Sequence, residues 1–208
     1  MIIGILGVQG NLQEHMAATR KAMDSLNVSG QVILVKDSKT LGHCDGLIIP
    51  GGESTTIWKL LDKTDLFWGV KEFARSGKPV FGTCAGLIIL AKKGDKQVNQ
   101  TGQELLRLMD VKVDRNAFGR QKDSFSVDLW VPRVSAKPFH CVFIRAPAVE
   151  KVWSDVEVLA KYSDKIVAVR QGNILGIAFH PELTEDTKFH EYFLKMVLEK
   201  KSKTTGSD

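Results

Sequence analysis

Continuous apolar runs and helically spaced apolar residues alternate along the first half of the chain. The continuous runs lack polar alternation, which is typical of strands buried on both faces of a parallel sheet. They occupy residues 2–8, 31–35, 45–49 and 79–82. In the intervening segments apolar side chains recur every three or four positions, which predicts helices at residues 12–23, 54–74 and 87–93. This order predicts right-handed crossovers and a parallel sheet with helices on both faces.

The second half of the chain has a different pattern, which starts at about Val111. Shorter β-rich runs lie at residues 124–131, 141–144, 156–162, 166–170 and 174–179. Turn pairs such as Gly172-Asn173 separate them, and these pairs predict antiparallel hairpins. A last helix is expected over residues 186–200.

We therefore expect one α/β domain over residues 1–200, with a mostly parallel central sheet, helices on both faces and an antiparallel, β-rich C-terminal half. A disordered polar tail is expected at residues 201–208. The length of 208 residues fits a single domain. Because 43% of the residues are hydrophobic and 25% are charged, a disordered chain, a collagen-like repeat and a disulfide miniprotein are excluded.

The net charge, the length of the apolar runs and the cysteine content limit which partners and which cellular compartment can be expected. The net charge is +5, but the basic residues are dispersed, so nucleic-acid binding is not expected. No apolar run approaches the roughly 20 residues of a membrane span. The first residues show no secretory signal pattern, and the three cysteines show neither a disulfide framework nor metal-ligand spacing. We therefore expect a cytoplasmic protein with free thiols and no membrane partner.

The segment Gly82-Thr83-Cys84-Ala85-Gly86 carries the strongest candidate chemistry. It has the form G-x-nucleophile-x-G between a predicted strand and a predicted helix, with cysteine where hydrolases place serine. The helix would direct its free N–H groups at the sulfur and favour the thiolate. A free cysteine can also be a small buried hydrophobic residue, and we interpret Cys44 and Cys141 in that way.

His180-Pro181-Glu182 follows a predicted strand and supplies a candidate base with an orienting carboxylate. Pro181 turns the chain, so that Glu182 can hold one imidazole nitrogen while the other faces a thiol. A loose histidine beside a surface glutamate is the alternative interpretation. The other histidines lack such a partner and are interpreted as structural: His15, His43, His140 and His190.

The glycines of the segment Pro50 to Ser54 let backbone N–H groups converge on an anion. The N–H groups of Gly52 and Ala85 are the expected oxyanion donors. The same segment fits an ordinary turn with Ser54 as a helix cap, and the two interpretations are compatible. Asn11 is similarly expected to cap the first helix.

With its motifs in the chain order Cys, His, Glu, the sequence resembles the class I, triad-type glutamine amidotransferases. Within them it is most similar to the glutaminase subunits of pyridoxal 5′-phosphate synthases. The matching motifs are LGVQG at residues 6–10, GGESTT at 51–56, GTCAGLI at 82–88, RNAFGRQ at 115–121, FIRAP at 143–147 and HPELTED at 180–186.

The resemblance implies a role for each site residue. Cys84 would be the nucleophile, His180 the general base and Glu182 its orienter. Substrate contacts are implied for Gly52, Glu53, Ser54, Arg115, Ile144 and Arg145. The arginines, Arg120 included, could equally be surface charges when they are taken singly. Neither a metal nor a cofactor is implied.

The implied reaction is hydrolysis of L-glutamine to L-glutamate and ammonia through a γ-glutamyl thioester. No synthetase follows in the chain, so we expect a separate (β/α)₈-barrel synthase subunit to use the ammonia for pyridoxal 5′-phosphate, in a large hetero-oligomer. Gln9 and Gly10 end the first predicted strand on the same sheet edge as Cys84 and Gly52. We therefore expect them to meet the partner and to gate the oxyanion site.

Two other function classes remain open at this point. A stand-alone cysteine hydrolase would use the same triad but would leave Gln9-Gly10 unexplained. A catalytically idle interaction subunit would have lost Cys84, His180 or Glu182, and all three are present.

Overall fold

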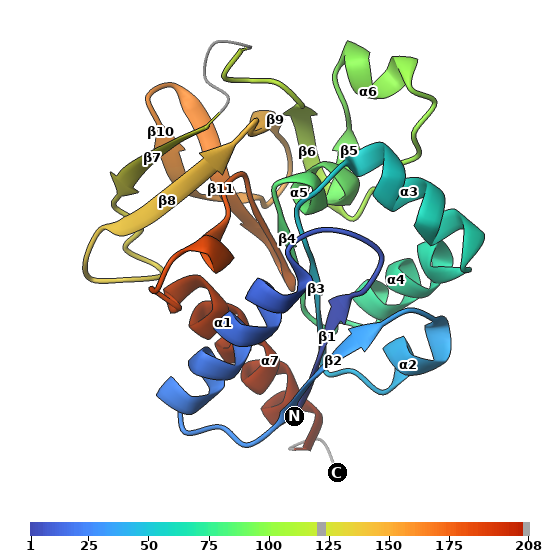
Figure 1. The fold of residues 1–208 in the computed structure, drawn as a ribbon, viewed down its shortest axis with the longest axis vertical. Helices are drawn as coiled ribbons and strands as arrows, with labels where there is room; N and C mark the ends of the chain where they lie inside the picture. Colours follow the sequence, from blue (N-terminus) through green and yellow to red (C-terminus); the bar gives the residue numbers. More distant parts are fainter. Residues whose placement is uncertain (120–123, 206–208) are drawn as a thin grey trace.

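The computed structural model describes residues 1–119 and 124–205. Arg120 and residues 206–208 lie outside the described part of the chain. Parallel strands form one half of the main sheet (Figure 1). In spatial order they are β2 (Gln31–Val35), β1 (Ile2–Leu6), β3 (Gly46–Ile49), β4 (Val80–Thr83) and β12 (Ile174–Ile177). Their carboxyl ends share one edge of the sheet, so the loops that follow them gather there.

The other half of the main sheet is mostly antiparallel. After β12 the order continues through β11 (Lys165–Gln171), β9 (Ala148–Val152), β6 (Met109–Asp114) and β5 (Ala91–Lys93), and β10 (Glu157–Tyr162) pairs with β11. Strands β7 (Ser124–Leu129) and β8 (Phe139–Ile144) form a separate antiparallel ribbon. The predicted fold class, including the antiparallel second half, is confirmed.

Helices cover both faces of the parallel strands (Figure 1). On one face α1 (Leu12–Ser25) packs against α7 (Lys188–Thr205). The other face carries α3 (Ser54–Lys63), α4 (Leu66–Arg75) and α5 (Ala85–Leu90). The short helices are α2 (Ser38–Gly42), α6 (Lys96–Gln100) and the 3₁₀ turn η1 (Pro181–Leu183). None of the helices within residues 1–119 and 124–205 has the length and apolar character needed to cross a bilayer.

Several predicted elements have different bounds in the structure. The helix expected over 54–74 is broken into α3 and α4 at Asp65, which has a left-handed φ of 55°. The helix expected over 87–93 ends at Leu90, because Leu90 accepts a backbone hydrogen bond from Leu108 at 3.0 Å and the chain continues as strand β5. Helix α7 extends through Thr205, into the segment expected to be disordered, and Lys201 is held by Asp45 at 3.0 Å.

Aromatic packing joins the β7–β8 ribbon to the rest of the core. Phe139 on β8 lies edge-on to Phe189 on α7, with 4.9 Å between ring centroids. Phe143 contacts Phe179 at 5.5 Å, and Phe179 contacts Phe189 at 5.1 Å. All four rings are fully buried. The cluster therefore fixes the end of β12, where the chain continues into His180.

The start of α5 packs directly on strand β3, at Gly86. A Cβ atom at Gly86 would collide with the carbonyl oxygen of Ile49, and backbone on both sides leaves no side chain that could move aside. We expect Gly86→Ala to destabilise the protein by about 1–3 kcal/mol, the usual range for overpacking. The measurement is the midpoint of urea unfolding.

Gly42, in α2, is the matched control, because nothing lies within 4 Å of a Cβ placed there. Gly42→Ala is expected to leave the midpoint unchanged or to raise it slightly, since it restricts the unfolded chain. Equal midpoints for Gly86→Ala and Gly42→Ala would contradict the close approach of α5 and β3.

Candidate active site

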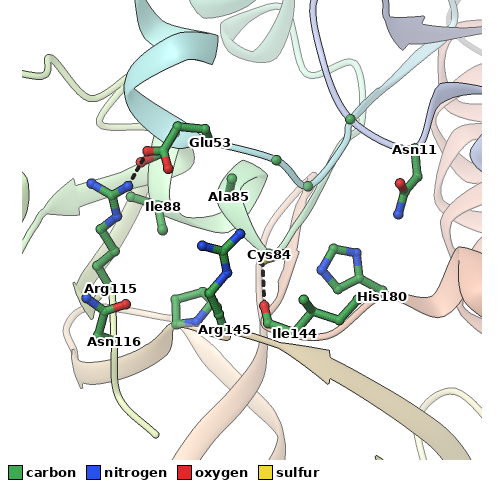
Figure 2. A pocket seen from close by; sticks show the side chains of 15 residues that line it. Asn11, Glu53, Cys84, Ala85, Ile88, Arg115, Asn116, Ile144, Arg145 and His180 are labelled. Carbon is green, nitrogen blue, oxygen red and sulfur yellow. Dashed lines mark hydrogen bonds and ion pairs between the residues drawn. The ribbon is translucent and has the colours of Figure 1, made fainter. Parts of the chain in front are cut away.

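A pocket of about 240 Å³ opens at the carboxyl ends of β1, β3, β4 and β12. Figure 2 shows Cys84 and His180 on one side of it, and Glu53 with Arg115 on the other. Its lining brings together nearly all the residues singled out from the sequence: Gly10, Gly52, Glu53, Ser54, Cys84, Ala85, Arg115, Ile144, Arg145 and His180. Glu182 lies behind His180. Such a volume suits a small polar ligand.

Cys84 occupies a strained turn between β4 and α5. Its φ of 50° and ψ of −105° are rare for a residue with a side chain, and the residue is 7% exposed. Because α5 begins at Ala85, the free N–H groups of the helix start beside the sulfur. The Sγ atom lies 3.9 Å from the carbonyl oxygen of Ile144. The sharp turn thus presents the thiol to the pocket.

His180 joins the sulfur to a carboxylate. Its backbone N–H donates to Val142 on β8 at 2.8 Å, and its ring Nδ1 lies 2.8 Å from Glu182 Oε1. An ionised carboxylate only accepts hydrogen bonds, so Nδ1 carries the proton of that bond. Burial alone would lower the pKa of His180, but its hydrogen bonds with Cys84 and Glu182 raise it to about 10. These two contacts therefore favour the protonated form of His180.

The carboxylate of Glu182 is fully enclosed, and three side chains surround it. Besides the bond with His180, Oε1 accepts a hydrogen bond from Asn11 Nδ2 at 3.0 Å. Oε2 lies 3.3 Å from Nε2 of His15. Burial alone would raise the pKa of Glu182, but the neighbouring His15 ring, then the bonds from His180 and Asn11, lower it to about 2.

Two interpretations of polar residues on and before α1 are therefore wrong. Asn11 makes no side-chain cap for α1, because its amide is directed to Glu182 instead. The sequence pattern offers His15 no carboxylate partner, yet it contacts Glu182. The same interpretation is wrong for His140, which pairs with Asp128 at 2.7 Å on the surface. His190 is buried beside His15, at 3.2 Å.

The loop after β3 is held by the loop after β1. Gln9 Oε1 accepts a hydrogen bond from the backbone N–H of Glu53 at 3.1 Å. Gly10 has a φ of 104°, and a Cβ atom there would collide with the carbonyl oxygen of Gly51. The backbone of Gly10 thus packs against the peptide that links Gly51 to Gly52. Since C=O and N–H point in opposite directions across a peptide, the N–H of Gly52 points away from Gly10.

Charged side chains line the outer part of the pocket. Arg115 Nη2 forms an ion pair with Glu53 Oε1. Arg145 has a φ of 40°, and its guanidinium points toward the middle of the pocket in Figure 2. Arg145 forms no ion pair with any residue in the described part of the chain. Opposite charges therefore face the same space, as a zwitterionic ligand requires.

The Ser54 hydroxyl does not face this ligand space. It donates to Gln103 Oε1 at 3.0 Å, where both side chains are buried. The cap position of α3 is Glu53 rather than Ser54, so the expected serine cap is also absent. Ser54 lines the pocket, but its side chain is occupied elsewhere.

Sequence reasoning missed Asn11, His15 and Gln103. The only available signal was position: Asn11 directly follows the Gln9-Gly10 turn, and His15 lies four residues further, on the same face of a helix. Their partners are distant in the sequence, so no local pattern marks them. Within residues 1–119 and 124–205, no group of three or more His, Cys, Asp and Glu side chains is arranged to hold a metal ion.

Taken together, the geometry suits transfer of an acyl group. A thiol and an imidazole line the same pocket, and a buried carboxylate holds the imidazole at 2.8 Å; such a set of groups can attack a carbonyl and protonate its leaving group. Charges of both signs surround the place where the rest of a substrate would lie.

Comparison with known proteins agrees with this chemistry. The model of the SNO glutamine amidotransferase family matches residues 5–199. The chain is 51% identical over 196 residues to "Pyridoxal 5'-phosphate synthase subunit PdxT" of Archaeoglobus fulgidus, covering 94% of this chain and 98% of the relative. The protein of the same name from Pyrococcus furiosus is 49% identical over 197 residues, again covering 94% and 98%.

The chain is also similar to proteins of known structure. A crystal structure of a glutamine amidotransferase is 41% identical with a TM-score of 0.83, covering 95% of this chain and 99% of that chain. PurLQS from Thermotoga maritima shares only the fold, at 15% identity and a TM-score of 0.61, with 96% and 97% covered.

The three free thiols should differ in reactivity. Burial raises the pKa of Cys44 to about 11 and also raises the pKa of Cys141, whereas Cys84 lines the pocket together with His180. At pH 7 we expect iodoacetamide to alkylate Cys84 at least about ten times faster than the other two, since each unit by which burial raises the pKa of Cys44 or Cys141 lowers its reactive thiolate fraction tenfold. Peptide mapping by mass spectrometry measures the order of labelling.

Two controls accompany this experiment. The unfolded chain should react at all three thiols alike, and His180→Asn should slow the labelling of Cys84 alone. Faster labelling of Cys44 or Cys141 in the folded protein would show that the turn after β4 does not activate its cysteine.

Proposed function

Because the chain belongs to the SNO glutamine amidotransferase family, we propose that its pocket hydrolyses L-glutamine to L-glutamate and ammonia. The observation that carries the proposal is that Cys84 and His180 line one pocket with charges of both signs, while Glu182 pairs with His180 at 2.8 Å. We further propose that the ammonia passes to a pyridoxal 5′-phosphate synthase.

Recognition of glutamine follows from the charges around the pocket. The α-ammonium group needs an anionic acceptor, and Glu53 supplies one. The α-carboxylate needs a cation, and Arg145 and Arg115 are both within the lining. Arg115 already forms an ion pair with Glu53. The charged groups of a bound amino acid would therefore contact these two side chains while they remain paired with each other. The side-chain amide would then extend toward Cys84.

In the first half of the reaction, the Cys84 thiolate attacks the carbon of the side-chain amide. The tetrahedral oxyanion would be held by the N–H groups of Gly52 and Ala85. As the C–N bond breaks, His180 gives its proton to the leaving nitrogen, so that ammonia departs and a γ-glutamyl thioester remains. The raised pKa of His180 supports this role, because it keeps the proton available at neutral pH.

In the second half, His180 is neutral and acts as a general base. It takes a proton from water, whose oxygen attacks the thioester carbon; the C–S bond then breaks and regenerates the thiolate, with L-glutamate as the product. Glu182 keeps the Nδ1 proton of His180 in place throughout, and its low pKa supports a carboxylate that stays ionised.

The partner is inferred from the relatives that carry the name of a synthase subunit. We propose a separate (β/α)₈-barrel synthase subunit as the acceptor of ammonia, within a large hetero-oligomer. We also place the reaction in the cytoplasm, where a nucleophilic thiol stays reduced. The three cysteines are free, which fits this compartment.

Gating by the partner is a further part of the proposal. Gln9 and Gly10 touch the loop that carries the Gly52 oxyanion donor, through the hydrogen bond to Glu53 and the packing on Gly51. A partner that docks on Gln9-Gly10 would therefore act on the orientation of the Gly51–Gly52 peptide. Glycine residues allow such a rotation at little steric cost.

The triad variants test the chemistry directly. With the synthase subunit present, Cys84→Ser and His180→Asn should each abolish glutaminase activity, by about 10⁴-fold or more, whereas Glu182→Gln should leave measurable turnover. Because the groups act as a unit, the double variant His180→Asn/Glu182→Gln should be no slower than His180→Asn. The readout is steady-state production of glutamate. Strictly additive losses would argue against a shared line of proton transfer.

The gating proposal predicts that the isolated chain is a poor glutaminase. Loss of one oxyanion donor costs about 10²–10³ in rate, so glutamate production at saturating glutamine should rise by about that factor when excess synthase subunit is added. Cys84→Ser with the same excess is the control, because it shows that the glutamate comes from this pocket. Equal rates with and without the synthase subunit would reject gating and favour a stand-alone amidase.

A further inference from the structure

Behind the triad lies a pair of buried histidines that the proposed reaction does not use. His15 comes from α1 and His190 from α7, and both are 0% exposed. His15 Nδ1 lies 3.2 Å from His190 Nε2. On its other side, His15 Nε2 lies 3.3 Å from Glu182 Oε2 and 3.2 Å from Thr83 Oγ1. The two imidazoles therefore extend the triad into the core.

We propose that His15 is a positioning residue for the triad: its Nε2–H stabilises the second carboxylate oxygen of Glu182, and His190 fixes the tautomer that places the proton there. The inference rests on the proposed glutaminase function, because the effect of His15 is exerted on the base of that reaction.

The surroundings of His190 favour this tautomer of His15. Burial lowers the pKa of His190 to about 3 and also lowers that of His15, so both rings are neutral and each carries one N–H. His190 Nδ1 is buried and has no hydrogen-bond partner in the described part of the chain. A proton on that nitrogen would be an orphaned donor, so the proton sits on Nε2 and is donated to His15 Nδ1. The proton of His15 is then on Nε2.

The surroundings of the Glu182 carboxylate favour the same tautomer of His15. Glu182 Oε2 is buried and makes no well-aligned hydrogen bond with a described residue. A lone pair on His15 Nε2, 3.3 Å away, would repel this oxygen, whereas an N–H there attracts it. The Thr83 hydroxyl can accept from the same N–H at 3.2 Å.

His15 consequently matters for the charge state of Glu182. The titratable groups near His15 that affect its pKa or contact its ring come from three elements. They are Glu182 and His180 from the chain around η1, His190 from α7, and the exposed Glu14 from its own helix. Among the described residues, Oε1 of Glu182 has two donors, but Oε2 has only the His15 contact. Without that contact the ionised carboxylate is less stable, and it takes up a proton at a higher pH.

The test is His15→Leu, assayed in the complex with the synthase subunit. We expect kcat to fall by about 10–100-fold, the usual effect of removing a partner that orients a reacting group, while KM stays nearly unchanged. In a plot of kcat against pH, the fall in kcat on the acid side (the acid limb) should move to higher pH, because activity requires ionised Glu182. His15→Gln keeps an N–H donor. Its kcat should therefore be close to that of the wild type, and its acid limb should lie at the wild-type pH.

Met23→Ala is the matched structural control, because Met23 is buried on the same helix and does not line the pocket. It should lower the midpoint of thermal unfolding without moving the acid limb. If the acid limb of His15→Leu lies at the same pH as in Met23→Ala and the wild type, the inference is overturned, because His15 is then a packing residue only.

A second variant keeps the test decisive if His15→Leu does not fold. His190→Phe retains an aromatic ring beside Phe81, which now packs edge-on to His190 at 6.0 Å, but removes the donor that fixes the His15 tautomer. It should move the acid limb in the same direction by a smaller amount, and an unmoved limb contradicts the proposal. Absence of glutaminase activity in the wild-type complex is a different result, which would refute the proposed function instead.

Discussion

The Glu182 carboxylate is a charge enclosed by protein, and an ion in that position is tolerated only when other groups satisfy it. Its partners come from three separate parts of the chain. His180 stands two residues before it, Asn11 follows β1, and His15 lies on α1. Any change in the placement of α1 against η1 would remove the Asn11 and His15 contacts and leave the buried charge with His180 alone. The geometry of the site is therefore coupled to the packing of one face of the fold.

The parallel sheet and its aromatic support set the remaining distances. Cys84 follows β4 in a strained conformation, and the close packing of Gly86 on Ile49 leaves α5 little freedom to relax it. His180 follows β12 and is fixed by its hydrogen bond to β8, while Phe179 packs into the buried ring cluster. Thiol and imidazole are thus held by rigid elements on neighbouring strands, which is where a reaction that needs fixed geometry is best placed.

One short segment after β1 contacts two separate parts of the site, the loop after β3 and the Glu182 carboxylate. Gln9 and Gly10 contact the loop of Gly51 to Glu53, and Asn11 contacts Glu182. The proposed oxyanion donor and the Glu182 carboxylate therefore share a neighbour. A partner protein that moved this segment would reach both of them at once, which a separate loop for each function would not allow.

The sequence by itself determined the fold class, the motifs and the family. Unbroken apolar strands, the G-x-Cys-x-G turn and the His-Pro-Glu segment are local patterns, and the resemblance that they carry is confirmed by the family match and the relatives. Only the tertiary structure decided what depends on contacts between distant residues. It directed Asn11 to Glu182 rather than to its own helix, turned Ser54 toward Gln103, and joined His15 to a carboxylate 167 residues away. No local pattern encodes these contacts, because a buried polar side chain takes its partner from whichever element packs beside it.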